Sequence, residues 1–315
     1  MDPLSDVLHA VRLSGAYFYL VEAAAPWSVP TAPARELVPR VLPTAEHLIS
    51  YHILLSGSCW AGVEGESQVQ LLPGDVIVFP HGHPHLMSSA NGFRVDPRRE
   101  APADRYPETV LLGPENARDT SFVCGFLGCD LRPFNPLITS LPSQLYLRGA
   151  DCAWISNFAR HVLAETRAGR AGREMMLTRM AELMFVEVLR NYVERAPHAQ
   201  TGWLAGLVDP VVGPALTKLH EIPGRAWTLA DLARESNASR SVLVERFART
   251  VGIPPMLYLK RWRLQLAAEQ LARGTAKVAS VGAQVGYDSE AAFSRAFKQE
   301  TGMSPAAWRR GAATP

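Results

Sequence analysis

The pattern of apolar and polar residues changes character along the 315-residue chain. Between residues 40 and 147, short apolar runs such as HLISYHILL and DVIVF are separated by Gly, Pro and Ser, which predicts a β-rich unit. From Trp154 to Tyr192, apolar residues recur at helical spacing in two amphipathic segments that flank a break rich in Gly and Arg. Residues 196–214 hold three prolines and three glycines, and they predict a linker with short turns.

The C-terminal residues repeat one helical pattern. A shift of 50 residues superimposes five positions of the two copies, which are Ser239, Leu243, Phe247, Gly252 and Pro255 in the first and Ser289, Phe293, Phe297, Gly302 and Pro305 in the second. In each copy Ser is a favourable N-cap, two apolar residues four apart form a stripe for burial, and Gly and Pro end the helix. Each copy follows another short helical segment, so the pattern predicts two helix-turn-helix units.

In the second copy, the face opposite this stripe has small residues near the start of the helix and cations toward its end, and the first copy carries polar and charged residues on the equivalent face. A major groove about 12 Å wide admits a helix with such a slim, polar leading face. The sequence therefore predicts that both helices contact DNA. The expected contact residues are Arg240, Ser241, Glu245 and Arg246 in the first copy, and Glu290, Ala291, Ser294, Arg295 and Lys298 in the second.

Charge is distributed unevenly between the two ends of the chain. The formal net charge is +2, yet residues 201–315 carry a net +6 and residues 1–200 a net −4. All four lysines lie in the C-terminal part. An acidic body with a basic end favours an anionic partner, and double-stranded DNA is the first choice.

The segment GYDSEAAFSRAFKQETGMSP, residues 286–305, resembles the signature of AraC/XylS-type bacterial transcription regulators. The preceding helix carries residues at that family's spacing, namely Pro255, Tyr258, Leu259, Arg263, Ala267 and Leu271. The resemblance covers residues 210–311 and implies two helix-turn-helix units joined by one long helix, with recognition helices in successive major grooves. It also implies that the base-facing residues are Ser241, Glu245, Ala291 and Arg295. For Trp262 and Arg263 a structural role and a phosphate contact both remain open.

Residues 71–87, LLPGDVIVFPHGHPHLM, resemble the second conserved motif of cupins, a small β-barrel fold. In metal-dependent cupins the resemblance implies that His85 is a ligand, together with a His-x-His pair and a Glu. Ser50 stands at the place of that Glu, and residues 43–46, where the pair falls, contain no histidine. We therefore expect no metal, no other cofactor and no oxygenase site.

Another group of side chains is expected inside the barrel. Period-2 alternation places His52 on the same face as Ser50, so His52 and His85 are expected to meet, with Cys124 as a third interior group. A protonated histidine would lower the pKa of the Cys124 thiol and make it reactive toward oxidants or electrophiles. Cys129 would be a resolving partner only if the strand bends back. The alternative is that Cys124 is a packed core thiol and that the same cavity holds a small organic molecule.

The second amphipathic segment carries an apolar stripe that is a candidate dimer interface. Packing of this stripe on the chain's own barrel is the alternative. Its residues are Met176, Met180, Leu183, Met184 and Val188.

The sequence indicates neither membrane insertion nor secretion. No run of about 18 apolar residues predicts a membrane span, and the N-terminus lacks the basic-then-apolar pattern of a signal peptide. Four cysteines in a chain of this length do not form a secreted disulfide framework. We therefore expect a cytoplasmic protein with no membrane partner.

Together these patterns predict an α+β protein with four parts. They are a cupin-like sensor barrel over residues 1–150, a helical hairpin for dimerisation over 151–196, a linker over 197–210 and an all-α domain with two helix-turn-helix motifs over 211–315. The expected function is regulation of transcription by a homodimer that binds operator half-sites and RNA polymerase. Activation is expected, with repression as the other mode.

In this prediction the barrel senses a small molecule or a redox-active species and shifts DNA binding. No nucleophile–base constellation stands out, so no enzyme activity is expected. The rival interpretations are a cupin enzyme with a DNA-binding appendage and a metal-responsive regulator.

Overall fold

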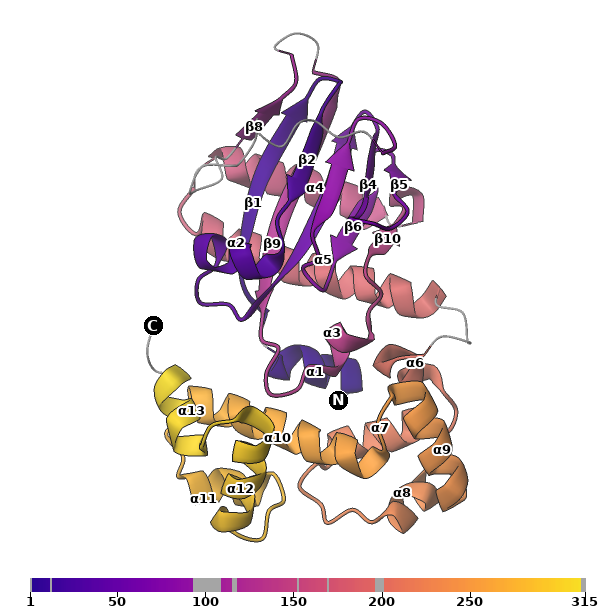
Figure 1. The fold of residues 1–315 in the computed structure, drawn as a ribbon, viewed down its shortest axis with the longest axis vertical. Helices are drawn as coiled ribbons and strands as arrows, with labels where there is room; N and C mark the ends of the chain where they lie inside the picture. The colour runs from indigo at the N-terminus through magenta and orange to yellow at the C-terminus, as the bar shows by residue number, and fades with distance from the viewer. Residues whose placement is uncertain are drawn as a thin grey trace. The chain divides into compact units, whose positions relative to one another are not determined.

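The computed structural model describes residues 2–11, 13–92, 109–114, 118–151, 153–168, 170–195 and 201–312. The chain divides into two compact units, whose elements are labelled in Figure 1. The barrel unit combines residues 13–130 and 141–195, and the helical unit combines residues 1–12, 131–140 and 196–315. Among the described residues, no helix has the length and apolar character needed to cross a membrane.

Two β-sheets enclose the core of the barrel unit (Figure 1). One sheet has the strand order β10-β6-β3-β9-β1-β8 and the other the order β2-β7-β4-β5. All neighbouring strands pair antiparallel except β1 and β8, which pair parallel. The strands are β1 Leu13–Ala23, β2 Ser28–Thr31, β3 His47–Ser56, β4 Cys59–Val63, β5 Val69–Leu71, β6 Val76–Phe79, β7 His85–Ser88, β8 Thr109–Leu112, β9 Thr120–Cys129 and β10 Leu145–Leu147.

The central strands of the larger sheet are buried on both faces, which explains why they read as continuous apolar runs. In β3, Leu48 and Leu54 belong to the core between the sheets, whereas Tyr51 lies on the opposite face. Tyr51 crosses its neighbour Gly125 in β9, where a Cβ atom would lie 2.2 Å from the Tyr51 hydroxyl. Only glycine fits at that position.

Among the described residues of the barrel unit, three helices and one short 3₁₀ turn accompany the strands. They are α2 (Ala34–Val41), the turn Gly149–Asp151, α4 (Ala153–Ala168) and α5 (Arg173–Arg195). Helix α5 packs against β1, β9 and β10, and α4 packs against β3 and β1. The predicted helical hairpin therefore exists, and it also covers one face of the larger sheet.

The apolar stripe proposed for dimerisation is divided by this packing. Met184 and Val188 are buried within the barrel unit, whereas Met176 and Leu183 are more than half exposed, at 53% and 59%. Met180 is half-buried. The stripe therefore consists of an inner part that is core and an outer part that remains open in a single chain.

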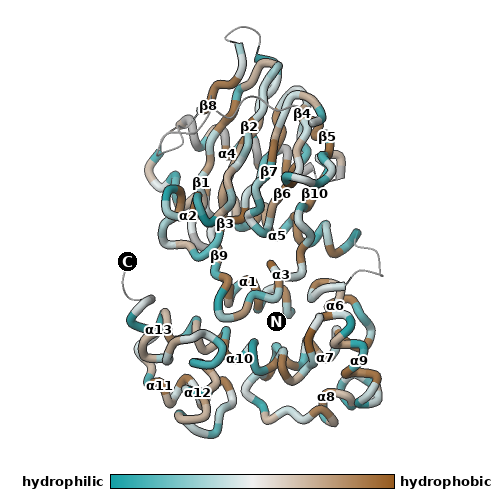
Figure 2. Tube along the Cα trace, in the orientation of Figure 1, coloured by the Kyte–Doolittle hydropathy of each residue, from teal (hydrophilic) through white to brown (hydrophobic). Residues whose placement is uncertain are grey.

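The helical unit is built from ten helices among its described residues. They are α1 Pro3–Ala10, α3 Pro136–Ser140, α6 Trp203–Val208, α7 Val212–Glu221, α8 Leu229–Glu235, α9 Arg240–Val251, α10 Pro255–Arg273, α11 Val278–Gln284, α12 Glu290–Thr301 and α13 Pro305–Ala312. In Figure 2, brown apolar stretches alternate with teal polar ones along these helices. That alternation is typical of helices that are buried on one side.

Two short segments of the expected barrel domain belong instead to the helical unit. Helix α1 contacts α7 and α10, and the segment 131–140 contacts α6 through α3. Gln265 of α10, which is 3% exposed, joins both segments. Its Nε2 donates to the Ala10 carbonyl at 2.8 Å, and its Oε1 accepts from the Phe134 N–H at 3.0 Å.

The expected linker is also more ordered than its composition predicts. Residues 203–208 form α6, and Trp203 is buried, with its indole N–H donating to the Tyr258 hydroxyl at 2.7 Å. The same hydroxyl lies 2.8 Å from Nε2 of the buried His220. The second half of the predicted linker is thus part of the helical core.

Candidate functional site

Local capping signals define the first helix-turn-helix unit, α8 and α9. Thr228 and Asp231 form a capping box at the start of α8, in which the Thr228 hydroxyl accepts from the Asp231 N–H at 3.1 Å. Ser239 caps α9 by accepting from the Val242 N–H, and Gly252 ends the helix with a left-handed φ of 88°.

The second unit, α11 and α12, repeats this construction. Ser289 caps α12 by accepting from the Ala292 N–H at 3.2 Å, and Gly302 ends the helix with a φ of 78°. Phe293 and Phe297 are completely buried, and their rings meet edge to face at 5.6 Å. The predicted stripe is therefore core, and the opposite face of α12 points away from it.

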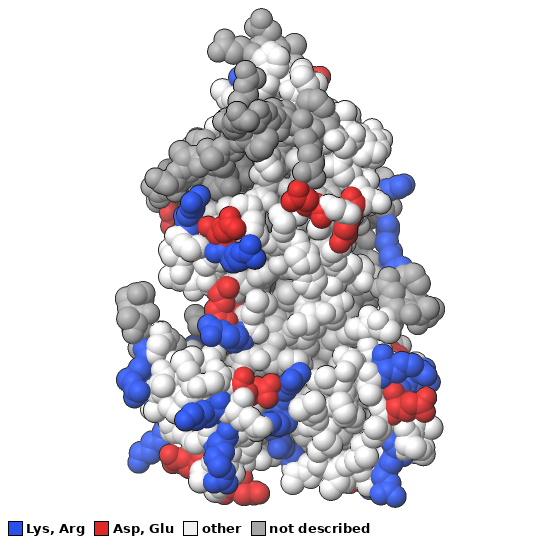
Figure 3. All heavy atoms as spheres, viewed as in Figure 1, with Lys and Arg blue, Asp and Glu red and all other residues white. Residues whose placement is uncertain are grey.

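The structure leaves most of the predicted DNA-contact residues exposed. Figure 3 shows Lys and Arg side chains gathered over the helical unit, with some Asp and Glu between them. Ser294 and Arg246 are half-buried. The exposed residues are Arg240, Ser241 and Glu245 on α9 and Glu290, Ala291, Arg295 and Lys298 on α12.

Arg246 differs from the others because its guanidinium is engaged within the unit. Its Nε donates to Asp209 Oδ2 at 2.8 Å, and Asp209 also accepts from the N–H groups of Val211 and Val212 at the start of α7. Burial raises the pKa of Asp209, but these hydrogen bonds outweigh burial and hold the pKa below its usual value. Arg246 thus ties α9 to the α6–α7 turn, a contact that the sequence analysis missed.

Inside the barrel unit, the structure brings together the three predicted sensor residues. His52 Nδ1 lies 2.8 Å from Cys124 Sγ, and His52 Nε2 lies 2.8 Å from His85 Nε2. His52 and Cys124 face each other across the β3–β9 pair, and β7 supplies His85. All three side chains are at least 98% buried. Tyr19 of β1 also hydrogen-bonds to Cys124, which sequence reasoning missed.

The hydrogen-bonding partners determine where the protons lie. His85 Nδ1 is 3.0 Å from the His83 carbonyl, which can only accept, so Nδ1 carries the proton and Nε2 is bare. His52 must then donate from Nε2, and its own bare Nδ1 accepts from the Cys124 S–H. The result is a directional chain from thiol to backbone carbonyl in which every member is neutral.

The pKa shifts agree with this neutral state. Burial raises the pKa of the Cys124 thiol far above its usual value, and the hydrogen bond from Tyr19 opposes this only partly. Burial lowers the pKa of His85 to about 4, and that of His52 well below its usual value. The expectation that a protonated histidine lowers the thiol pKa therefore does not describe this structure. The resting thiol is protonated and shielded.

Cys129 does not approach Cys124 in this fold. Strand β9 pairs continuously with β3 from Cys129 to Phe122, so the strand does not bend back. An odd separation along a regular strand places the two side chains on opposite faces. The condition set for Cys129 as a resolving partner is not met.

The residues present do not fit the metal centre of metal-dependent cupins. The His52 ring lies between Cys124 and His85 and uses a different nitrogen toward each, so one ion cannot reach all three side chains. Within the described part of the chain, no group of three or more His, Cys, Asp or Glu side chains is arranged to hold a metal ion.

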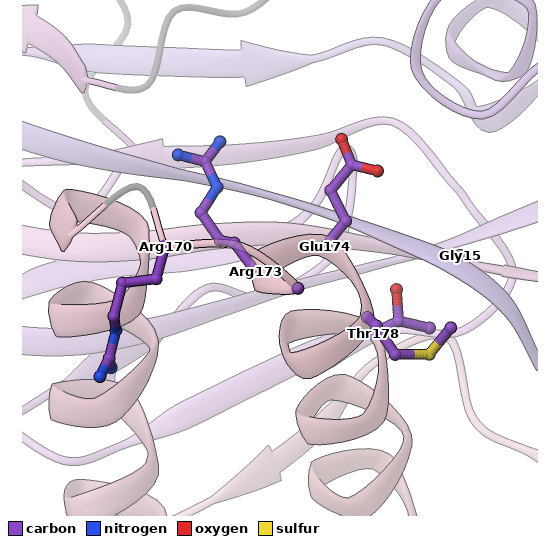
Figure 4. Close-up of a pocket in the computed structure, with 7 residues that line it drawn as sticks. Gly15, Arg170, Arg173, Glu174 and Thr178 are labelled. Atoms are coloured by element: carbon purple, nitrogen blue, oxygen red, sulfur yellow. The ribbon is translucent and has the colours of Figure 1, made fainter.

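A separate open pocket of about 700 Å³ lies where β1 begins and α5 starts (Figure 4). Arg170, Arg173, Glu174 and Thr178 line it beside Gly15. Arg170 forms an ion pair with Glu165. The charges in this pocket are mixed, and nothing in it indicates one class of ligand.

Comparison with known proteins agrees with both units. A family model described as a cupin matches residues 2–194, and one described as a helix-turn-helix domain matches residues 232–311. A putative AraC-like transcription regulator of Streptomyces lividans is 36% identical, over 100% of this chain and 100% of the relative. A second putative AraC-like transcription regulator, of Streptomyces antibioticus, is 31% identical, over 98% and 99%. The RCS-specific HTH-type transcriptional activator RclR of Escherichia coli is 25% identical, over 83% and 84%.

Proposed function

Because the chain belongs to the AraC-like family of DNA-binding transcription regulators, we propose that it recognises operator DNA with α9 and α12 and that an effector acting on the barrel unit changes this binding. The observation that carries the proposal is the division of α12 into two faces. Phe293 and Phe297 anchor one face in the core, and Ala291, Arg295 and Lys298 are exposed on the other.

On this proposal each residue type has a distinct task. Arg295 reads a base edge, since a guanidinium can donate two hydrogen bonds to guanine in the major groove. Ala291 keeps the leading end of the helix slim enough to enter the groove. Arg240 and Lys298 contact phosphates. Arg246 acts indirectly, because it holds α9 against the α6–α7 turn through Asp209.

The salt dependence of DNA binding tests this assignment. Full-length protein is titrated with fluorescent duplex DNA at several salt concentrations. Neutralised phosphates release counterions, so the logarithm of the binding constant should fall linearly and steeply with the logarithm of salt concentration. A flat response would remove the nucleic-acid function.

For the sensor, the support comes from the chain Tyr19–Cys124–His52–His85. Four polar groups buried together inside a barrel must be held by specific hydrogen bonds, so a chemical change at Cys124 disturbs all of them. The RCS-specific activator among the relatives is consistent with a reactive species as effector. A small organic molecule is the second candidate.

Replacement of Cys124 separates these two candidates. A promoter reporter is exposed to hydrogen peroxide and to an α,β-unsaturated aldehyde in cells that carry wild-type protein or Cys124→Ser. Thiol sensing requires that the response disappears in the variant, with Cys59→Ser as the matched buried-thiol control. An unchanged response in Cys124→Ser would show that Cys124 is not the sensing thiol.

The proposed regulator acts as a homodimer. The support is the outer part of the α5 stripe, where Met176 and Leu183 are 53% and 59% exposed, and Met175 beside it is 62% exposed. Two copies that join through this face would present paired DNA-binding units to paired half-sites, and the effector would shift the population of the binding-competent arrangement. RNA polymerase is the proposed second partner. No catalytic role is proposed for any residue.

A further inference from the structure

Arg263, in the middle of α10, hydrogen-bonds to both helix-turn-helix regions at once. Its Nε donates to the Pro223 carbonyl and its Nη2 to the Arg225 carbonyl, both at 2.7 Å. These carbonyls lie in the turn between α7 and α8, which leads into the first unit. Its Nη1 donates to the Gly286 carbonyl at 3.3 Å, in the turn between α11 and α12 of the second unit.

The two turns also touch each other directly. A Cβ atom on Gly286, whose φ is +88°, would lie 2.6 Å from the Gly224 carbonyl oxygen and 2.8 Å from Arg263 Nη2. A Cβ atom on Gly224 would lie 2.7 Å from the Gln284 carbonyl oxygen. Glycine on both sides therefore permits a backbone-to-backbone approach, with the Arg263 guanidinium beside it.

Arginine suits this position for a geometric reason. Its planar guanidinium carries five N–H donors in a rigid fork, whereas a lysine ammonium is a single point on a flexible stem. The three carbonyls accept from three different nitrogens of the fork, so the side chain constrains both the distance and the rotation between the turns. Arg263 is half-buried as a whole, and its bond to the Arg225 carbonyl lies at the exposed edge of the site.

We propose that Arg263 is a positioning residue that sets the spacing between the two DNA boxes that one protomer accepts. The proposal rests on the proposed function, in which α9 and α12 enter successive major grooves. Each helix-turn-helix unit packs on α10, and the Arg263 contact adds a direct connection between their turns. With this connection intact, α9 and α12 keep one separation and one relative orientation.

DNA spacing is a sensitive measure of that geometry. One added base pair moves the second box by about 3.4 Å along the axis and turns it by about 35°, a tenth of a helical turn. A rigid pair of helices must reject the altered site or lose one set of contacts. A loosened pair can follow it.

The experiment compares full-length wild-type protein with Arg263→Met, Arg263→Lys and the control Arg273→Met. Arg273 lies in the last turn of the same helix, and its exposed guanidinium pairs with Glu269, one turn earlier, at 2.9 Å. Each protein selects binders from a random-sequence duplex library. Affinity is then measured on duplexes whose boxes are one base pair closer or farther apart than in the selected site.

We expect wild type and Arg273→Met to recover two boxes at one spacing. Arg263→Met should recover the same boxes at several spacings, and its discrimination between spacings should fall about tenfold, the change expected when a charge-assisted hydrogen bond is lost. Arg263→Lys keeps the charge without the fork and should show the same broadening. If Arg263→Met does not fold, the spacing selected by Arg263→Lys tests the proposal instead.

Three results would overturn the proposal. One is an unchanged single spacing in a folded Arg263 variant. Another is an altered base preference inside one box, which would make Arg263 a reader. The third is an equal loss of affinity at every spacing, which would make it a phosphate contact or a purely stabilising group. If wild type itself selects no DNA, the proposed function fails, and the spacing role of Arg263 that rests on it fails with it.

Discussion

At the scale of single residues, the hydrogen-bonding partner of a charged side chain distinguishes residues that contact DNA bases from residues that stabilise the protein. Arg295 and Arg246 both lie on helices expected to contact DNA, and the sequence analysis named both as contact residues. Arg295 is exposed on α12, whereas Arg246 is engaged by Asp209. The two residues should therefore respond differently to substitution.

Replacing Arg295 with Ala should weaken binding to the preferred DNA site by about 1–3 kcal/mol and relax the preference at one base position. The physical reason is the loss of two hydrogen bonds to one base edge. Competition binding with duplexes substituted at each position measures the effect. Lys298→Ala is the control and should weaken binding to all sequences alike. A uniform loss for Arg295→Ala as well would show that Arg295 touches phosphate.

Acid should destabilise the barrel unit through its buried neutral histidines. Burial lowers the folded-state pKa of His85 to about 4 and also lowers that of His52, so the unfolded chain binds more protons as pH falls below about 6.5. The free energy of unfolding should thus be constant above that pH and fall by at most about 1.4 kcal/mol per pH unit for each histidine between pH 6.5 and 4.

Denaturant unfolding of the barrel unit between pH 4 and 8 measures this slope. His85→Gln removes one titrating group and should flatten the curve. His9→Gln, on α1 of the helical unit, is the control substitution outside the barrel unit. The same slope in His85→Gln as in wild type would contradict the buried neutral state.

At the scale of elements, the features that could be predicted were local, and those that could not depended on distant partners. Ser289, the Phe293–Phe297 pair and Gly302 lie within one short helix, so their spacing was enough to define α12. The Arg246–Asp209 pair joins residues 37 positions apart, and its discovery required the folded structure. The barrel site lies between these cases, because strand parity predicted that His52 faces inward but nothing predicted Tyr19.

Helix α5 shows the same limit, since periodicity identified its apolar stripe but not which part the barrel covers. Leu183→Glu places a charge on the exposed part and should give folded monomers by sedimentation, with weaker binding to paired half-sites. Met184→Glu buries an unpaired charge and should unfold the barrel unit instead, because Met184 is completely buried. A stable dimer in Leu183→Glu would place the dimer interface elsewhere.

At the scale of the whole molecule, the chain passes between its two units more often than the composition indicates. Residues 2–11 precede β1 and residues 131–140 lie between β9 and β10, yet both segments belong to the helical unit. Gln265 forms a hydrogen bond with Ala10, 255 positions away in the sequence, and no sequence pattern predicted this contact. The predicted domain boundary at residue 150 therefore assigned both segments to the barrel domain.

Replacing Gln265 with Leu should lower the free energy of unfolding of the helical unit by about 1–3 kcal/mol for each buried backbone group left without a partner. The groups affected are the Ala10 carbonyl and the Phe134 N–H. Amide hydrogen exchange should quicken in α1, α7 and α10 while the barrel strands keep their protection. Gln284→Leu, at an exposed position of α11, is the matched control. Unchanged exchange in α1 would show that the Gln265 bonds do not hold it.

The central claim is that α9 and α12 read two successive major grooves, and footprinting of full-length protein on its selected DNA tests it most directly. Hydroxyl-radical protection should appear in two stretches per protomer on one face of the duplex, with centres about 10.5 base pairs apart. Arg295→Ala should weaken the protection at one box and leave the other in place. A single protected stretch per protomer, or equal protection of unrelated DNA sequences, would contradict the account.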